Sequence, residues 1–349
     1  MVTVRRPAGP PGYAADTMTE AQHGGAVTVA YIGGMGRSGS TLLARVLGQV
    51  PGVCQVGEIC YLWKQSVLRD RLCSCGNPFS ECPFWQQVGA AAFGGWSHRQ
   101  AQRADHLRRS VERNRNVVRL AVSRPGRAGR AGRAGETGRF AGQVREYRDL
   151  MTQVFRAVSD VSGASVVVDN SKLPSSAYLL RGAAGLDLRV LHLIRSSYGV
   201  SYSWAKELSR ADFDGRPMRR FSPARSAGEW LAYNAAFDLL AALGVPRLLL
   251  HYEDFVAAPR QWTETALRFL DVPVADAALA FLGQDSVDLD VDHGLWGNPM
   301  RVRVGRQQLR LDDAWRAGLP RRDRAAVTAL TLPGLLRYGY AGRRRNAGR

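Results

Sequence analysis

Short apolar runs rich in β-branched residues alternate along the chain with apolar positions at helical spacing. Four of these runs predict buried strands, at residues 27–32, 165–168, 188–194 and 247–251. Polar or Gly-containing residues follow each run, and apolar positions three or four residues apart come next, which is typical of amphipathic helices. Strands that alternate with helices pair in parallel. The pattern therefore predicts an α/β fold with a central parallel sheet between helical layers, and ligand sites at the carboxyl ends of the strands.

The region between the first and second predicted strands has a different pattern. Residues 99–163 predict a helical insertion, and the Arg-Ala-Gly repeats within it predict a flexible loop at 124–138, because such a composition cannot bury enough surface to become ordered. We expect a disordered N-terminal segment at 1–25, one main domain at 26–340 and a basic tail at 341–349.

The charge of the chain is strongly positive but unevenly distributed. Its 349 residues include 48 Lys or Arg and 30 Asp or Glu, for a formal net charge of +18. Residues 99–148 hold 14 Arg against four acidic residues, and the tail adds four more Arg, so the rest of the chain is close to neutral. Electrostatic nucleic-acid binding requires a basic face on the folded surface. A basic nucleic-acid-binding protein therefore stays an alternative, but a disfavoured one.

The apolar content of 45% provides for a sizeable core. No apolar run approaches the roughly 18 to 20 residues that would span a membrane. The first 25 residues contain Arg5 and Arg6 but no apolar stretch of the signal-peptide kind. The five Cys are too few for a small disulfide-built scaffold. A soluble cytoplasmic protein is the expectation.

A glycine-rich turn follows the first predicted strand and precedes a helical pattern. Glycines let the backbone approach an anion, and the first turn of a helix attracts phosphate through its N–H groups and dipole. Gly34 to Thr41 fits the phosphate loop G-x-x-x-x-G-K-[ST], except that Ser40 occupies the Lys position. That Lys reaches the β and γ phosphates of ATP or GTP, so its absence argues against ordinary nucleotide hydrolysis.

The same glycines also fit a second template. Gly34, Gly36 and Gly39 match G-x-G-x-x-G, and Glu58 could serve as the ribose-binding acid of a dinucleotide fold. However, residues 53–57 make a poor second strand, and the loop carries more hydroxyl groups than a pyrophosphate requires. An NAD(P)-dependent oxidoreductase is therefore kept as an alternative.

Residues 36–43, Gly-Arg-Ser-Gly-Ser-Thr-Leu-Leu, resemble the 5′-phosphosulfate loop of sulfotransferases that use 3′-phosphoadenosine 5′-phosphosulfate (PAPS). The nucleotide of this family has no β or γ phosphate, which would account for the missing Lys. The resemblance implies a P-loop-like three-layer sandwich, an O-sulfotransferase activity that proceeds by in-line displacement, and PAPS as co-substrate. It implies that the 5′-phosphosulfate is bound by Gly36, Arg37, Ser38, Gly39, Ser40 and Thr41.

A later segment resembles the 3′-phosphate site of the same family. Arg195 ends the predicted strand 188–194, and Ser203 follows eight residues later. An Arg offers a planar fork of donors to a phosphate, and a Ser in the following helix can return to the same group. Arg301, in a Gly-Asn-Pro-x-Arg segment, resembles a residue that closes over the nucleotide in bacterial members.

Three residues are candidates for the chemistry. Lys172 lies at the carboxyl end of a predicted strand and is one of only three Lys in the chain. A compact ammonium suits the charge that develops during sulfuryl transfer, as does Arg37 in the loop. Glu58 comes shortly after the first predicted helix. The resemblance implies a role as general base, because tyrosine-protein and several carbohydrate members of the family carry a Glu base at this position. His192, by contrast, lies within an apolar strand and is expected to be a core residue.

This chemistry requires no metal. Cys73, Cys75 and Cys82 lack the paired C-x-x-C spacing of a structural zinc site. We therefore expect buried thiols, with a redox role left open. Aromatic residues around them could line a site for a small-molecule or carbohydrate acceptor, and a sugar, lipid or polyketide-like hydroxyl fits equally well.

Overall fold

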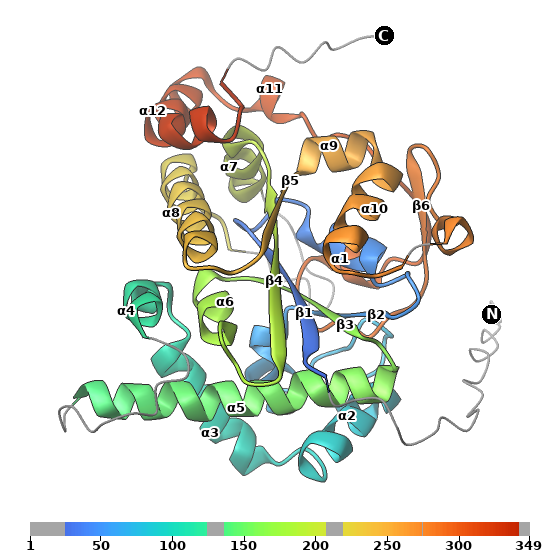
Figure 1. The fold of residues 1–349 in the computed structure, drawn as a ribbon. Coiled ribbons are helices and arrows are strands. Elements are labelled where there is room, and N and C mark those ends of the chain that lie inside the picture. The colour runs from blue at the N-terminus through green and yellow to red at the C-terminus, as the bar shows by residue number, and fades with distance from the viewer. Residues whose placement is uncertain (1–24, 124–135, 207–218, 274, 342–349) are drawn as a thin grey trace, which may run out of the picture.

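A five-stranded parallel sheet forms the centre of the molecule (Figure 1). The computed structural model describes residues 25–123, 136–206, 219–273 and 275–341. The strands are β1 (Val27–Gly33), β2 (Val53–Gly57), β3 (Val166–Lys172), β4 (Leu186–Ile194) and β5 (Arg247–His251). Their order across the sheet is β2-β3-β1-β4-β5. The sheet reverses its order at β1, so the turn after β1 lies where ligands bind in open α/β sheets.

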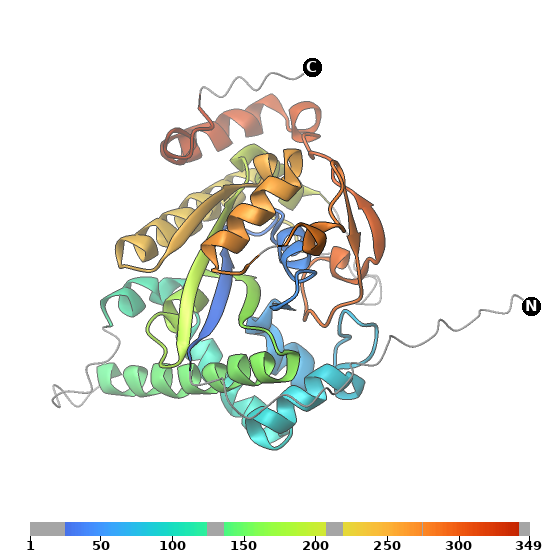
Figure 2. The ribbon, with the colours of Figure 1, turned by 45° about the vertical axis from the view of Figure 1, so that its right-hand side comes forward.

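Helices cover both faces of the sheet, as Figures 1 and 2 show from two directions. One face packs against α1 (Ser40–Leu47), α9 (Tyr252–Ala257) and α10 (Pro259–Phe269). On the other side, the sheet is covered by α5 (Glu136–Ser162), α6 (Pro174–Leu180) and α8 (Pro223–Ala242). Three further helices pack outside these and complete the same core cluster: α2 (Pro83–Phe93), α3 (His98–Val111) and α4 (Val117–Val122). Near the carboxyl ends of the strands lie α7 (Ser197–Ala205), α11 (Trp315–Gly318) and α12 (Arg321–Arg337). The family's three-layer sandwich is thus confirmed.

Shorter elements connect these layers. Single helical turns occur at η1 (Ile59–Tyr61), η2 (Leu62–Val67), η3 (Phe79–Glu81), η4 (Asn114–Asn116), η6 (Asp276–Leu279) and η7 (Pro299–Val302). A separate antiparallel hairpin pairs β6 (Ser286–Leu289) with β7 (Gly305–Gln308).

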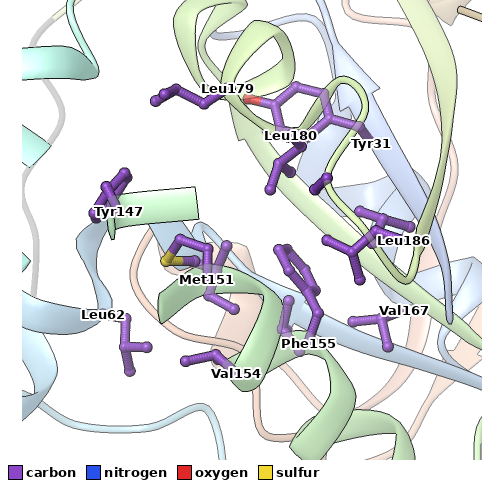
Figure 3. Packing of buried hydrophobic residues seen from close by; sticks show 14 of the residues in the cluster. Tyr31, Leu62, Tyr147, Met151, Val154, Phe155, Val167, Leu179, Leu180 and Leu186 are labelled. Atoms are coloured by element: carbon purple, nitrogen blue, oxygen red, sulfur yellow. The ribbon is translucent and has the colours of Figure 1, made fainter. Parts of the chain in front are cut away.

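The strand β1 explains why one sheet supports two cores. Val29 and Tyr31 point into the cluster beneath α5, whereas Ala30 and Ile32 point into the cluster beneath α1. All four side chains are fully buried. Figure 3 shows the first cluster, where Tyr31 meets side chains from α5, α6 and β3. A strand that is buried on both faces reads as a continuous apolar run, which is the pattern that identified it.

The four strands predicted from the sequence are all present, and β5 has the expected bounds. The interpretation of residues 53–57 as a poor strand is wrong, because they form β2. This strand lies at the edge of the sheet, with β3 on one side and only a single bridge from Gly57 to Leu295 on the other among the described residues. It therefore needs less apolar character than a central strand. Its buried Gln55 is satisfied locally, since its Oε1 accepts a hydrogen bond from the N–H of Gly57 at 2.9 Å.

The predicted helical insertion consists of α3, α4 and α5 with η4 between them. The last three residues of the predicted loop belong to α5, which begins at Glu136. The remainder of that loop (124–135), the segment 1–24 and the tail 342–349 lie outside the described residues. Among the helices that the structure describes, none combines the length and the apolar character that crossing a bilayer would demand.

Candidate active site

The turn between β1 and α1 is shaped by glycines that no other residue could replace. Gly34 has φ 129°, and a Cβ on it would lie 2.3 Å from the carbonyl oxygen of Leu193. Gly39 has φ 92°, and a Cβ there would lie 2.4 Å from the ring of Tyr252. Both positions require a left-handed backbone as well as space, so only glycine fits. The turn is thereby held against β4 and α9.

The turn ends at the amino terminus of α1, where Gly39 is the N-cap residue. The first N–H groups of a helix have no intrahelical acceptor and form an anion site together with the helix dipole. Ser38 is buried beside them, and its Oγ has no hydrogen-bond partner among the described residues. Ser40 and Thr41 line the adjacent cleft. These donors fit a phosphosulfate group.

Arg37 and Trp204 brace the other side of the turn. The Arg37 guanidinium lies 5.0 Å from the centre of the Trp204 ring, a cation–π contact. The indole Nε1 of Trp204 donates a hydrogen bond to the carbonyl oxygen of Gly36 at 3.0 Å. A Cβ on Gly36 would stand only 3.0 Å from the same ring. The α7 helix thus supports the loop through Trp204.

Arg195 connects β4 to the same turn. Its Nη1 donates to the carbonyl oxygen of Arg37 at 3.1 Å, and its Nη2 lies 3.0 Å from Oδ2 of Asp312. Gly199 leaves room for the guanidinium, since a Cβ there would lie 2.9 Å from Nε of Arg195. Arg195 and Ser203 both line the cleft that contains the Arg37 turn. The two predicted phosphate pockets therefore face one space.

Glu58 and Lys172 form a close ion pair on the far side of that cleft. The distance from Lys172 Nζ to Glu58 Oε1 is 2.7 Å, and their side chains are only 13% and 12% exposed. Lys172 Nζ also donates to the carbonyl oxygen of Asn170 at 2.6 Å. A pair held this far from water is strongly coupled, so removing one partner leaves an uncompensated charge. The sequence named both residues but did not predict that they touch.

The backbone at the site shows a feature that the sequence did not signal. Five residues other than glycine are described with positive φ, and three of them line the cleft: Arg37 (75°), Lys172 (68°) and Trp296 (50°). Left-handed backbone costs a non-glycine residue free energy and is tolerated mainly where the surroundings impose it, often at functional sites. The strain therefore marks the cleft independently of side-chain chemistry.

The segment that connects β6 to β7 packs against Glu58. The N–H of Glu58 donates to the carbonyl oxygen of Leu295 at 2.8 Å, and Leu295 N–H donates to Val56 at 2.9 Å. Arg45 anchors this segment to α1: it is buried, pairs with Asp292 at 2.8 Å and donates to the carbonyl oxygen of Met300 at 3.0 Å. Trp296, next in the chain after Leu295, is thereby held in the wall of the cleft that also contains Glu58 and Lys172.

The cleft has a volume of about 1080 Å³. Tyr61 and Trp296 pack at its Glu58 end with ring centres 5.4 Å apart. Its lining includes the predicted site residues Gly36, Arg37, Gly39, Ser40, Thr41, Glu58, Lys172, Arg195 and Ser203. Aromatic and basic side chains that the sequence analysis did not assign complete it: Tyr61, Trp204, Lys206, Arg219, Phe221, Arg225, Tyr233, Tyr252 and Trp296.

Not every predicted residue reaches this space. Arg301 is buried to 4% exposure in η7 and is outside the described lining of the cleft, whereas its neighbour Met300 is part of it. His192 is a satisfied core residue as expected: its Nε2 lies 2.9 Å from Asn234 Oδ1. Burial lowers the pKa of His192 to about 4, so the ring stays neutral. His251 Nε2 contacts the carbonyl oxygen of Tyr338 at 2.9 Å.

Two carboxyl groups, those of Glu112 and Asp169, lie buried beside a small internal cavity. Burial raises the pKa of Glu112 from 4.5 to about 8, against the opposing effect of Arg108. Burial likewise raises the pKa of Asp169 to about 7, although hydrogen bonds from Ser171 lower it. Both carboxyl groups line the same internal cavity as Cys60. The folded protein therefore disfavours their ionised forms.

This arrangement predicts a stability that falls as pH rises. The contribution of Glu112 is complete below its unfolded pKa of 4.5 and is lost as the pH rises through the folded value of about 8. We expect the free energy of unfolding in urea to fall by on the order of 2 to 5 kcal/mol between about pH 5 and about pH 9. Glu112→Gln should flatten this slope, whereas the surface variant Glu264→Gln should keep it. An unchanged slope in Glu112→Gln would contradict the assignment.

The cysteine prediction needs a correction. Spacing along the chain argued against a metal site, but the structure brings Cys73, Cys75 and Cys82 together with His293. The fourth side chain comes from a segment 211 residues beyond Cys82, which local spacing does not reveal.

The sheet order, the glycine turn at its switch point and the basic cleft define a P-loop-type transferase that binds a nucleotide. Residues 30–276 match the sequence model of the sulfotransferase family, so the chain belongs to that family and is a sulfotransferase. Family membership implies PAPS as the sulfuryl donor. It decides in favour of the predicted sulfotransferase over the oxidoreductase and nucleic-acid alternatives.

Solved structures resemble the chain at low sequence identity. The sulfotransferase domain of the olefin synthase from Synechococcus PCC 7002 is 19% identical, with 91% of this chain and 98% of that chain covered and a TM-score of 0.45. The sulfotransferase domain from the curacin biosynthetic pathway is 16% identical, with 89% and 98% covered and a TM-score of 0.44. Sulfotransferase STF9 from Mycobacterium avium is 11% identical, with 88% and 76% covered and a TM-score of 0.42. No curated protein matches the sequence.

Proposed function

We propose that the protein is a PAPS-dependent O-sulfotransferase that acts on a hydroxyl group of a small organic acceptor by in-line displacement. The observation that carries the proposal is the common cleft, which is lined by the Arg37 turn, the Arg195 and Ser203 pocket, and the Glu58–Lys172 pair. One nucleotide and one acceptor can therefore meet at a single point between fixed charges.

Two groups of donors hold the nucleotide in this proposal. The N–H groups at the start of α1, with Arg37, Ser38, Ser40 and Thr41, bind the 5′-phosphosulfate. Arg195 and Ser203 bind the 3′-phosphate. In the structure the guanidinium of Arg195 forms an ion pair with Asp312, and its Nη2 lies 3.0 Å from Oδ2 of that residue. Nucleotide binding must therefore replace this carboxylate with a phosphate, which offers Arg195 a more highly charged partner.

The residues of the cleft divide the chemistry between them. PAPS, when bound, supplies the sulfuryl group and the 5′-phosphate that leaves. Glu58 accepts the proton of the acceptor hydroxyl while the acceptor oxygen forms its bond to sulfur and the sulfur–phosphate oxygen bond breaks. Arg37 and the N–H groups of α1 stabilise the charge that accumulates on the phosphate, and Lys172 stabilises the charge on the transferred group.

The Glu58 end of the cleft supports an acceptor with a flat or apolar body. Tyr61, Tyr233 and Trp296 line it, and the polar groups beside them include Asn114 and Glu229. Aromatic walls with a few polar groups are typical of pockets for small organic molecules. We therefore favour an aromatic, lipid-like or polyketide-like alcohol.

Thermal denaturation with adenosine 3′,5′-bisphosphate tests the nucleotide site. At a concentration of about 100 times Kd, this product should raise Tm by about 4 °C, clearly more than NAD or ATP does. Ser203→Ala should weaken bisphosphate binding roughly tenfold or more, because it removes a hydrogen bond to a charged group.

A matched control is Ser201→Ala on the same helix. Ser201 is fully buried and is not part of the described cleft lining, so this variant should bind as the wild type does. Equal affinities of the Ser203 and Ser201 variants would remove Ser203 from the 3′-phosphate site. A larger shift with NAD than with the bisphosphate would refute the choice of nucleotide.

A further inference from the structure

Three thiols and an imidazole form a compact group on the α2 side of the molecule. The ligand atoms of Cys73, Cys75, Cys82 and His293 all lie within 4.8 Å of one another. The Sγ of Cys82 is 3.7 Å from that of Cys75 and 3.6 Å from that of Cys73. Nδ1 of His293 is 3.3 Å from Cys82 Sγ and 3.8 Å from Cys73 Sγ.

These distances fit a tetrahedron around one ion. Zinc–sulfur bonds of about 2.3 Å and zinc–nitrogen bonds of about 2.0 to 2.1 Å place neighbouring sulfurs about 3.8 Å apart, and sulfur and nitrogen about 3.5 Å apart. A disulfide would bring two sulfurs to about 2.05 Å, which none of the measured pairs approaches. All the cysteines are free thiols. The spacing thus belongs to metal ligands rather than to a crosslink.

Local backbone structure holds the first two thiols in place. Gly76, with φ 91°, closes a tight turn after Cys75. The N–H of Gly76 donates to the carbonyl oxygen of Cys73 at 3.0 Å, and the N–H of Cys73 donates to Asn77 at 2.9 Å. Ser74 ties this turn to the histidine segment, because its Oγ donates to the carbonyl oxygen of Gly294 at 2.7 Å. Hydrogen bonds within this turn therefore fix the positions of Cys73 and Cys75.

The neighbouring aromatic residues fix the imidazole. The ring of Phe84 stacks on His293 with ring centres 4.9 Å apart and planes at 14°. Nε1 of Trp85 donates to the carbonyl oxygen of His293 at 2.8 Å. Cys73 and Cys82 are fully buried. In metal sites, contacts from surrounding residues orient the ligand side chains. The contacts of Phe84 and Trp85 hold His293 beside the buried thiols in this way.

We propose that Cys73, Cys75, Cys82 and His293 bind a structural Zn²⁺ ion. Thiolates and imidazole are the donors that zinc prefers, and four protein ligands complete its tetrahedral coordination without an open position. The ion has no part in sulfuryl transfer. It crosslinks the turn of Cys73 and Cys75 to the segment that continues from His293 through Leu295, which bonds to Glu58, to Trp296 in the cleft wall. The metal therefore stabilises the acceptor side of the cleft.

The experiment measures the metal content of the purified full-length protein by inductively coupled plasma mass spectrometry. We expect about one zinc per chain in the wild type, and below about 0.2 in Cys82→Ser and His293→Ala. Cys54→Ser is the matched control, since Cys54 lies on β2 outside the group, and it should keep its zinc. Zinc content in the ligand variants equal to that of the control would overturn the proposal.

A second measurement covers the case in which ligand variants do not fold. Wild-type protein is stripped with a chelator and reconstituted with Co²⁺. Thiolate-to-cobalt charge transfer and the visible bands of tetrahedral Co²⁺ should appear and then disappear on addition of Zn²⁺. Tm should fall on stripping and recover on zinc addition. A metal-free wild type with unchanged Tm, or a disulfide between any two of the three cysteines in the purified protein, would refute the site.

Discussion

Glu58→Gln is expected to reduce the rate of sulfuryl transfer by about 10²- to 10⁴-fold, which is the usual contribution of a positioned general base. Gln has nearly the shape of Glu and can still accept a hydrogen bond from Lys172 at the 2.7 Å separation of the native pair. It cannot accept the proton of the acceptor hydroxyl. The loss should therefore appear in kcat and leave the binding of adenosine 3′,5′-bisphosphate near the wild-type value.

The measurement is single-turnover transfer of labelled sulfate from PAPS to an accepted alcohol, with bisphosphate affinity determined by calorimetry. Glu81→Gln is a suitable control, because Glu81 is exposed in η3 and is not among the described cleft residues. If Glu58→Gln turned over at the wild-type rate, Glu58 would have no role as a base. A variant that lost bisphosphate binding as well would show that Glu58 organises the nucleotide site instead.

The glycine turn between β1 and α1 was the part of the cleft that the sequence could predict best. The strand, the glycine turn and α1 are consecutive, so short-range geometry fixes how they meet. Arg195 directly follows β4, and Ser203 lies eight residues later on the next element, α7. Where a site is built from neighbours in the chain, its spacing already contains much of its shape.

Contacts between distant segments were not predictable in this way. Glu58 and Lys172 were each identified, but their ion pair depends on β2 and β3 lying side by side in the sheet. Residues 53–57, which form β2, had been interpreted as a poor strand. β2 gives a weak sequence signal because it is short, contains Gln55 and Gly57, and lies at the edge of the sheet.

The cysteine group shows the same limit more sharply. Its three thiols are close in sequence. The fourth candidate zinc ligand is His293, which lies on the segment between β6 and β7. Likewise, the aromatic contact at the Glu58 end of the cleft joins Tyr61 of η1 to Trp296 of the segment between β6 and β7. Neither partner carries a sequence signal for the other, because packing of the whole fold brings them together.

Lys172→Ala is expected to lower kcat/KM for sulfuryl transfer by about 10²- to 10³-fold, comparable to the loss of one preorganised donor at a developing charge. Lys172 is held by Asn170 and Glu58, so its ammonium is already oriented and needs no reorganisation during the reaction. Its backbone has φ 68°, a conformation that costs a non-glycine residue free energy and that the surrounding sheet must impose. The matched control is Lys64→Ala, which removes a Lys outside the described lining of the cleft and should keep its activity.

A double variant separates a direct role of Lys172 from a role through Glu58. Removing the ammonium leaves the largely buried carboxylate of Glu58 without its partner. If Lys172 acts only through Glu58, the double variant Glu58→Gln with Lys172→Ala should transfer sulfate at the rate of Glu58→Gln alone. If Lys172 also stabilises the transferred group, the double variant should be slower than Glu58→Gln by about 10² or more. Equal rates would therefore exclude the direct role, and wild-type activity of Lys172→Ala would exclude both.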